Sequence, residues 1–443
     1  MSQRKPDLGP TLKRTLVVAM ATLGISGLLH SQTAPQLSLA DAQALALKNH
    51  PQILASQAIS LRANQITRAT RSAYYPMVSG DVTGAQANLN SRLGAGVLNA
   101  PALFSHFGTG LTLSQLITDS GRTNNLVSHA KLQAQASKAD YQATRYDVIL
   151  GVNQAYYEVL FAEQLVKVAE QTVATRQTVV DQVSELTRSK LKSEVDLSFA
   201  QVNLSDAKLM QLRAQDRLAS AYAVLGQALG SQQSIRYRLS DQPMPPEPPA
   251  DAEQLIQQAF QNRPELTSLR LQQQADQKFV YAERDLNRPT VSLAAVGGAL
   301  PYINSGNANA DIPKGYEAAA VNVRIPVFNG HLFSARRQAA EYQLSATEQR
   351  VRGLEDRIAR DVRTSWERTR TSFEAIGATQ QLLAQANLAL DLAQGRYNLG
   401  LNSIVELTQA QLGQTSAEVE NLNAKYEYQE AYAGLQYTLG LLH

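Results

Sequence analysis

The chain has 443 residues, a formal net charge of +3 and no cysteine. The absence of cysteine excludes disulfides, thiolate metal sites and a lipid anchor on an N-terminal cysteine. Basic residues at the N-terminus precede an apolar stretch at residues 16–29 that contains no acidic residue. We interpret residues 1–34 as a secretory signal peptide, because about fourteen apolar residues are too few to span a bilayer as a helix.

The predicted signal peptide also accounts for the basic charge of the chain. Residues 1–34 hold four basic residues and one acidic residue, so the charge of +3 disappears when they are removed. The composition therefore gives no indication of a nucleic-acid partner. The remaining sequence contains no apolar run of about 18 residues, so a membrane-embedded form of the chain would have to be a β-barrel.

A helix and two strands are predicted to open the mature chain. Residues 39–74 have helical spacing, and Pro76 stops the helix. Residues 76–87 and 108–117 alternate apolar with small or polar side chains, which predicts two strands joined by a loop at residues 88–106. Each run has about the length of a tilted transmembrane β-strand.

A long helical hairpin is predicted next, at residues 120–230. Residues 120–188 contain no proline, and valine recurs there at every seventh position, with mostly small residues three positions later. The two series are Val152, Val159, Val166, Val173 and Val180, and Ala155, Ala162, Ala169, Arg176 and Val183. This heptad pattern predicts a coiled coil whose small residues let neighbouring helices approach closely. The alternative is an ordinary helical bundle.

A proline-rich segment at residues 241–250 predicts an extended linker between two repeats, residues 35–240 and residues 251–443. The first repeat holds a helix, the strand pair at about 76–118 and the hairpin. The second predicts a helix, a strand pair at about 290–328 and a long helical hairpin at residues 330–440. Its strands are predicted at residues 290–300 and 316–327, and its loop at residues 301–315.

Similar motifs support the duplication. Asn49-His50-Pro51 recurs 213 positions later as Asn262-Arg263-Pro264, and Leu229-Gly230 recurs 210 positions later as Leu439-Gly440. Two such halves are expected to stack into one quasi-symmetric object. Four strands cannot close a barrel, and an open strand edge is not tolerated in lipid. The chain is therefore predicted to oligomerise: two copies give eight strands with a filled interior, and three give twelve with a lumen.

Several of these motifs resemble the TolC family of outer-membrane efflux proteins, and the resemblance covers essentially the whole mature chain. The most specific motif is the turn at residues 396–407. One departure is Lys190 in the first turn, where the second turn has Gly400. The other motifs are the opening Leu39–Pro51, its repeat ending at residues 262–264, and the start of a strand at Tyr75-Pro76.

The resemblance implies a mainly α fold with a membrane β-barrel part. A homotrimer would close a twelve-stranded β-barrel in outer-membrane lipid, continued by an α-helical barrel in the periplasm. It further implies a passive exit duct for efflux or type I secretion, docked to a periplasmic adaptor and an inner-membrane transporter. No cofactor or metal is expected, because the histidines lack ligand spacing. Catalytic and nucleotide-binding motifs are also absent, so an enzyme is not predicted.

Two aspartates at equivalent positions are candidate gate residues. Asp181 and Asp391 each precede a leucine of the turn by ten positions. In a trimer they would supply up to six carboxylates about 15 Å inside the tip of the tunnel. A carboxylate ring favours cations, and pairing with Arg188 or Arg396 would hold a constriction. The alternative is a solvated helix face.

The two turns themselves are candidates for adaptor contact, by the resemblance. The candidate residues are Lys190, Leu191, Lys192, Ser193, Gly400, Leu401, Asn402 and Ser403. The alternative function is a periplasm-spanning coiled-coil scaffold or adhesin without channel activity, in which the loops between the paired strands would carry the binding chemistry. Ion conductance across a bilayer distinguishes the two, and the sequence does not identify the cargo.

Overall fold

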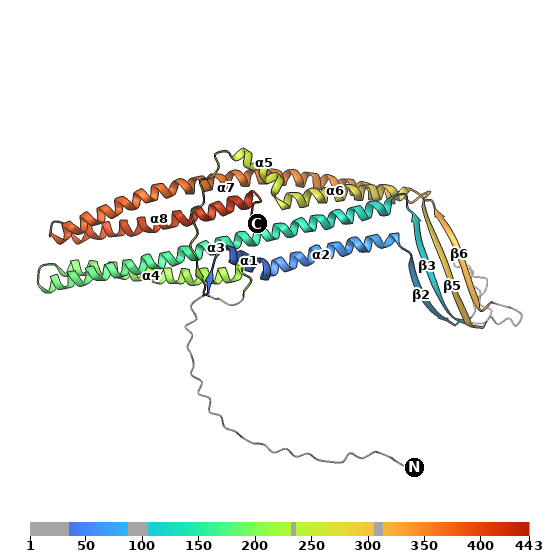
Figure 1. Cartoon of the computed structure of the whole chain (residues 1–443), viewed down its shortest axis with the longest axis horizontal. Helices are drawn as coiled ribbons and strands as arrows, with labels where there is room; N and C mark the ends of the chain where they lie inside the picture. Colours follow the sequence, from blue (N-terminus) through green and yellow to red (C-terminus); the bar gives the residue numbers. More distant parts are fainter. Residues whose placement is uncertain (1–34, 87–104, 232–235, 305–312, 443) are drawn as a thin grey trace, which may run out of the picture.

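The computed structural model describes residues 35–86, 105–231, 236–304 and 313–442. The predicted signal peptide and the greater part of both predicted strand loops lie outside these residues. The chain is elongated, with long helices side by side, four strands at one end and two helical tips at the other (Figure 1). Among the described helices, none combines the length and the apolar composition needed to cross a membrane.

The helices occur twice with the same lengths. The first set is α1 Leu39–Asn49, α2 Pro51–Arg71, α3 Arg122–Arg188 and α4 Glu194–Ala228, of 11, 21, 67 and 35 residues. The second set is α5 Ala252–Asn262, α6 Pro264–Arg284, α7 Leu332–Asn398 and α8 Ile404–Thr438, again of 11, 21, 67 and 35 residues. The equal lengths agree with the duplication inferred from the sequence.

The first predicted helix, residues 39–74, is in fact divided at His50. Pro51 is the first residue of α2, and His50 has extended backbone with φ −67° and ψ 126°. Proline disfavours the α conformation in the residue before it. The prediction of one continuous helix was therefore wrong, and the same break recurs at Arg263 before Pro264.

Two glycines bring the ends of the hairpins close to these breaks. Gly230 follows α4 with φ +73°, and Gly440 follows α8 with φ +70°. A Cβ atom at Gly230 would lie 2.8 Å from the Cα of His50, and one at Gly440 would lie 2.8 Å from the carbonyl carbon of Asn262. The repeated Leu-Gly motif is thus explained by both the left-handed turn and the close backbone approach.

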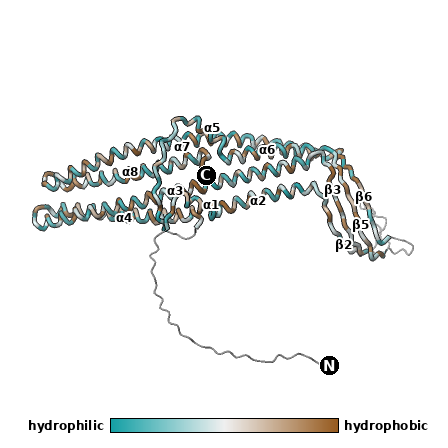
Figure 2. The backbone as a smooth tube through the Cα atoms, in the orientation of Figure 1, coloured by the Kyte–Doolittle hydropathy of each residue, from teal (hydrophilic) through white to brown (hydrophobic). Residues whose placement is uncertain are grey.

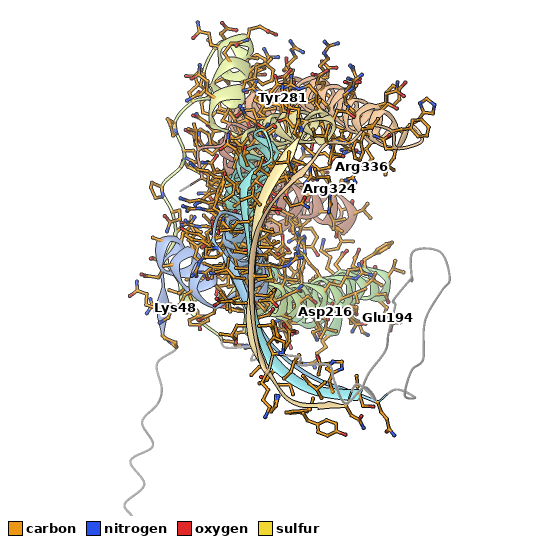
Figure 3. All side chains as sticks on the ribbon, turned by 90° about the vertical axis from the view of Figure 1, so that its right-hand side faces the viewer. Lys48, Glu194, Asp216, Tyr281, Arg324 and Arg336 are labelled. Carbon is orange, nitrogen blue, oxygen red and sulfur yellow. The ribbon has the colours of Figure 1, made fainter. Side chains whose placement is uncertain are left out.

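The four long strands form one antiparallel sheet in the order β2-β3-β5-β6. They are β2 Met77–Ala85, β3 Ser105–Thr118, β5 Thr290–Asn304 and β6 Gly315–Arg324. The repeats join through β3 and β5, where Leu113 lies opposite Ala295. Figure 3 shows the sheet as a curved band. Within the described chain, β2 and β6 each have one edge without a partner strand.

The strands differ from the prediction at several places, one of them the start of β3 at Ser105, inside the predicted loop at residues 88–106. β6 ends at Arg324 rather than Val327, because Pro326 has no N–H to donate. β5 continues to Asn304, so the predicted loop at residues 301–315 begins inside a strand. A short parallel pair, β1 Gln36–Leu37 with β4 Arg238–Leu239, was not predicted.

The core follows the predicted heptads. α3 packs against α2 and α6 toward the strands and against α4 and α8 toward the tips. Val152, Val159 and Ala162 are fully buried, as is Val362 at the equivalent position in α7. Figure 2 shows apolar and polar residues mixed along each long helix. The burial of apolar side chains at these heptad positions stabilises the packing of the long helices against one another.

Candidate functional site at the helical tips

The two tips turn through similar local structures at the end of the molecule opposite the strands (Figure 1). Ser193 caps α4: its Oγ accepts a hydrogen bond from the Asp196 amide at 3.1 Å, and the Asp196 carboxylate accepts one from the Ser193 amide at 3.2 Å. Ser403 caps α8 by accepting from the Glu406 amide at 3.4 Å. Serine is a favoured N-cap residue because its hydroxyl satisfies a free backbone amide of the first helical turn.

The backbone of both turns passes through the left-handed region. Lys190 has φ +59° and Gly400 has φ +72°. A lysine side chain makes this conformation costly, whereas glycine adopts it freely. The departure from the family pattern at Lys190 therefore leaves the turn intact and adds strain to the first tip.

The four predicted gate residues are not brought together within one chain. Asp181 and Asp391 are exposed, and Asp181 accepts a hydrogen bond from Gln177 at 2.9 Å. Arg188 pairs with Glu185 at 2.7 Å, and Arg396 lies 3.8 Å from Glu406. In the described part of the chain no ion pair joins these aspartates to these arginines, and the pairing predicted across a trimer stays a prediction.

A different contact joins the two tips, between Lys192 of the first and Tyr397 of the second. The Lys192 ammonium lies 4.5 Å from the centre of the Tyr397 ring, a cation–π distance. Tyr397 is 5% exposed and packs with Val183, Ile404 and Leu407. Burial, with a smaller contribution from Asp196, raises the pKa of the Tyr397 hydroxyl. We call Lys192, Asp196 and Tyr397 the tip cluster.

One residue of the tip cluster, Tyr397, could have been identified from the sequence. Arg396-Tyr397 stands where the first repeat has Leu186-Thr187, an asymmetry between otherwise similar turns. An aromatic residue placed in only one of two repeats indicates a contact that the other repeat does not make. Its partner, Lys192, became evident only from the structure.

An open groove runs beside the second tip, between α7 and α8. Its volume is about 780 Å³. Small residues form much of its lining, and Leu392 and Val405 are exposed in it at 60% and 55%. Arg396 and Glu406 add a charged pair at its end. A groove of small residues with apolar rims can accept an amphipathic helix.

Known proteins are similar to this chain in sequence over most of its length. The sequence model of the protein family described as "Outer membrane efflux protein" matches residues 43–231 and 255–441, and the proline-rich linker lies between the two matches. TolC of Vibrio cholerae serotype O1 is 24% identical over 420 residues, which cover 91% of each protein.

Two solved structures show the same fold. CusC superimposes with a TM-score of 0.78 at 20% identity, over 91% of this chain and 92% of CusC. A membrane protein from Pseudomonas aeruginosa gives a TM-score of 0.79 at 21% identity, over 91% and 93% of the two chains.

Proposed function

The chain belongs to the outer membrane efflux protein family, and from this premise we propose that it is a passive exit duct gated at its periplasmic tip. Membership makes it an outer-membrane protein of efflux or secretion and not an enzyme, as the sequence predicted. One observation carries the proposal: a four-stranded sheet at one end continues into helices of 67 residues that lead away from it.

Three copies are proposed to form the duct. The free edges of β2 and β6 support this, because an open strand edge in lipid leaves backbone groups unsatisfied. Met77, Val82 and Val321 are about 70% exposed on the strands, as a lipid-facing or inter-subunit surface requires. Three sheets would supply twelve strands, enough to enclose a lumen.

The helical part is proposed to span the periplasm. A helix of 67 residues has a length of roughly 100 Å. Since the sheet and the tips lie at opposite ends of the chain, a sheet in the outer membrane directs the tips toward the inner membrane (Figure 1). That position suits contact with partners on the inner-membrane side.

The gate is proposed to lie where the two hairpins meet. The tip cluster joins the α3–α4 hairpin to the α7–α8 hairpin, and a hydrogen bond of 2.9 Å from Asn203 to Thr408 adds to the contact. Separation of the hairpins would widen the tip at the cost of these contacts and of the apolar packing between Val183 and Tyr397. Asp181 and Asp391, both exposed, remain proposed as carboxylate rings that favour cations.

A periplasmic adaptor is proposed to dock at the second tip. The groove between α7 and α8 adjoins the predicted contact residues Gly400–Ser403 and fits an amphipathic helix. The first turn, Lys190–Ser193, would extend the contact. Energy for transport is proposed to come from an inner-membrane transporter, because the sequence carries no nucleotide-binding motif.

Planar-bilayer conductance of the purified protein tests the proposal. We expect small conductance from the wild type and larger steps from Tyr397→Ala, since this change removes the central side chain of the tip cluster. Asp181→Asn with Asp391→Asn should lower cation selectivity. Asp216→Asn, an exposed carboxylate elsewhere on α4 (Figure 3), is the matched control and should change nothing.

Two outcomes would test the proposed channel and the proposed gate independently. Steps of equal size from the wild type and Tyr397→Ala would keep the channel and reject the tip cluster as its gate. No conductance from a folded trimer of Tyr397→Ala would reject the channel in favour of the scaffold.

A further inference from the structure

A polar cavity between α3 and α8 is separate from the tip cluster. Its volume is about 190 Å³, and apart from Leu390 of α7 its lining comes from polar side chains of α3 and α8. Arg176 lies there, twelve residues before the end of α3, or roughly 18 Å along the helix. It occupies a position that the heptad otherwise gives to small residues in this helix, and its counterpart in the second repeat is Ala386.

The Arg176 side chain is buried and incompletely paired. It is 4% exposed, and its Nη1 has no hydrogen-bond partner among the described residues. No described carboxylate lies within 4.0 Å of its guanidinium nitrogens, since no ion pair includes it. Burial lowers the pKa of Arg176 to about 10, so the group stays cationic at neutral pH. A buried charge without a partner is strongly unfavourable.

A second unpaired donor lines the same cavity from the facing helix. Gln411 of α8 is 3% exposed, and its Nε2 also has no acceptor among the described residues. The nearby threonines do not supply the acceptor: Thr172 donates to the Val168 carbonyl at 2.8 Å and Thr175 to the Gln171 carbonyl, and neither hydroxyl accepts from Arg176 Nη1 or Gln411 Nε2. Two buried donors that lack an acceptor favour a ligand that accepts hydrogen bonds, and beside a buried guanidinium charge an anion also supplies the missing countercharge.

The carboxylate of Glu418, which also lines the cavity, limits the charge of that anion. Glu418 accepts a hydrogen bond from Gln414 at 3.0 Å and forms no ion pair with Arg176. Its negative charge opposes a divalent anion, so a monovalent one is favoured. A cavity of about 190 Å³ has room for a halide ion and several waters, since a water takes about 30 Å³ in the liquid.

We propose that Arg176 and Gln411 bind a monovalent inorganic anion of chloride size between α3 and α8. The anion neutralises the buried guanidinium and links the first repeat to the second near the tips. The proposal concerns binding and does not depend on channel activity. It assigns to Arg176 a role that a small residue at this heptad position cannot perform.

Thermal unfolding of the purified full-length protein tests the site. At constant ionic strength, replacing gluconate by chloride should raise the unfolding midpoint, because the proposed site takes a small inorganic anion and a ligand that binds only the folded state stabilises it. Arg176→Gln should abolish this shift, and Gln411→Leu should reduce it. Arg213→Gln removes an exposed arginine of α4 and should leave the shift unchanged.

Arg176→Met adds a test that does not rely on loss of stability. In gluconate this variant should unfold at a higher temperature than the wild type, because an apolar side chain of similar length replaces an unpaired buried charge. In chloride the difference should shrink. Crystals soaked in bromide should show anomalous density between Arg176 and Gln411.

The site would be overturned by equal wild-type midpoints in chloride and gluconate. A second result would also overturn it: the bromide-soaked crystals show no anomalous peak, and Arg176 pairs with Glu418 or with a carboxylate of a neighbouring copy.

Discussion

The α3–α4 and α7–α8 hairpins have the same helix lengths but differ in a few chemically distinctive residues. Positions 210 residues apart correspond. Arg176, Thr187, Lys190 and Ser220 of the first hairpin correspond to Ala386, Tyr397, Gly400 and Glu430 of the second. The shared heptads and serine caps reproduce the backbone, whereas at these positions a buried cation stands only in the first hairpin, and a buried tyrosine and a partly buried carboxylate only in the second.

The difference teaches that the repeats are complementary rather than interchangeable. Tyr397 of the second tip contacts Lys192 of the first, and Arg176 of the first repeat shares a cavity with Gln411 of the second. Each of these contacts needs different residues from the two halves. The following predictions test this complementarity.

The largest effect is expected from truncation of the tyrosine. Tyr397→Ala leaves a cavity where a 5% exposed ring now packs, which should cost about 3–5 kcal/mol of local opening free energy at the second tip. Hydrogen exchange of the tip amides measures this energy. The matched variant Thr187→Ala changes a partly exposed residue and should cost less than about 1 kcal/mol. Equal costs would show that the tips are equivalent after all.

The free energy of unfolding should depend on pH through Glu430 of the second repeat. Burial, then the nearby Glu158 and Glu427 carboxylates, raise the pKa of Glu430 to about 7, against Arg368 and Arg217, which lower it. The unfolded chain therefore releases this proton at lower pH than the folded chain. Stability should fall by about 1–3 kcal/mol as pH rises from about 4.5 to above 7.

Denaturant unfolding across this pH range measures the effect. Glu430→Gln should flatten the dependence. Glu420→Gln changes an exposed carboxylate on the same helix and should keep the wild-type profile. An unchanged slope in Glu430→Gln would assign the pH dependence to other groups.

A smaller effect is expected from the glycine of the second turn. Gly400→Ala places a Cβ on a residue with φ +72°, which should cost about 1–2 kcal/mol of tip stability. Nothing lies within 4 Å of that Cβ, so the cost comes from the backbone conformation alone. Hydrogen exchange at the tip provides the measurement, and Gly400→Asn, which tolerates this conformation better, should cost less.

The smallest effect is expected from the reverse change in the first turn. Lys190→Gly relieves a non-glycine residue at φ +59° and should stabilise the first tip by less than about 1 kcal/mol, because glycine also gains entropy in the unfolded chain. A loss of stability on this change, measured in the same way, would mean that the Lys190 side chain makes a contact in the assembled duct.

Most of the fold was predictable because its signals are local. The two long helical hairpins and the turn within residues 396–407 agree with the structure. The missed break at His50 was also a local signal, since Pro51 follows it. The prediction gave more weight to helical spacing than to proline.

The site was less predictable because its members come from both repeats. Asp181 and Asp391 were chosen for their equivalent positions, and the rings predicted for them depend on neighbouring copies rather than on contacts within one chain. Arg188 and Arg396 instead pair with glutamates close to them. The tip cluster depends on how one hairpin lies against the other, and no spacing within a single repeat encodes that arrangement.

By itself the sequence determined the duplication, the long coiled-coil helices, the strand pairs and the family, because periodicity, caps and turn motifs depend on residues close together in the chain. Only the tertiary structure decided that β3 pairs with β5, that Tyr397 meets Lys192, and that Arg176 is buried facing Gln411. These contacts join residues about 200 positions apart, and their energies depend on distance and burial, which exist only after the two repeats have packed together.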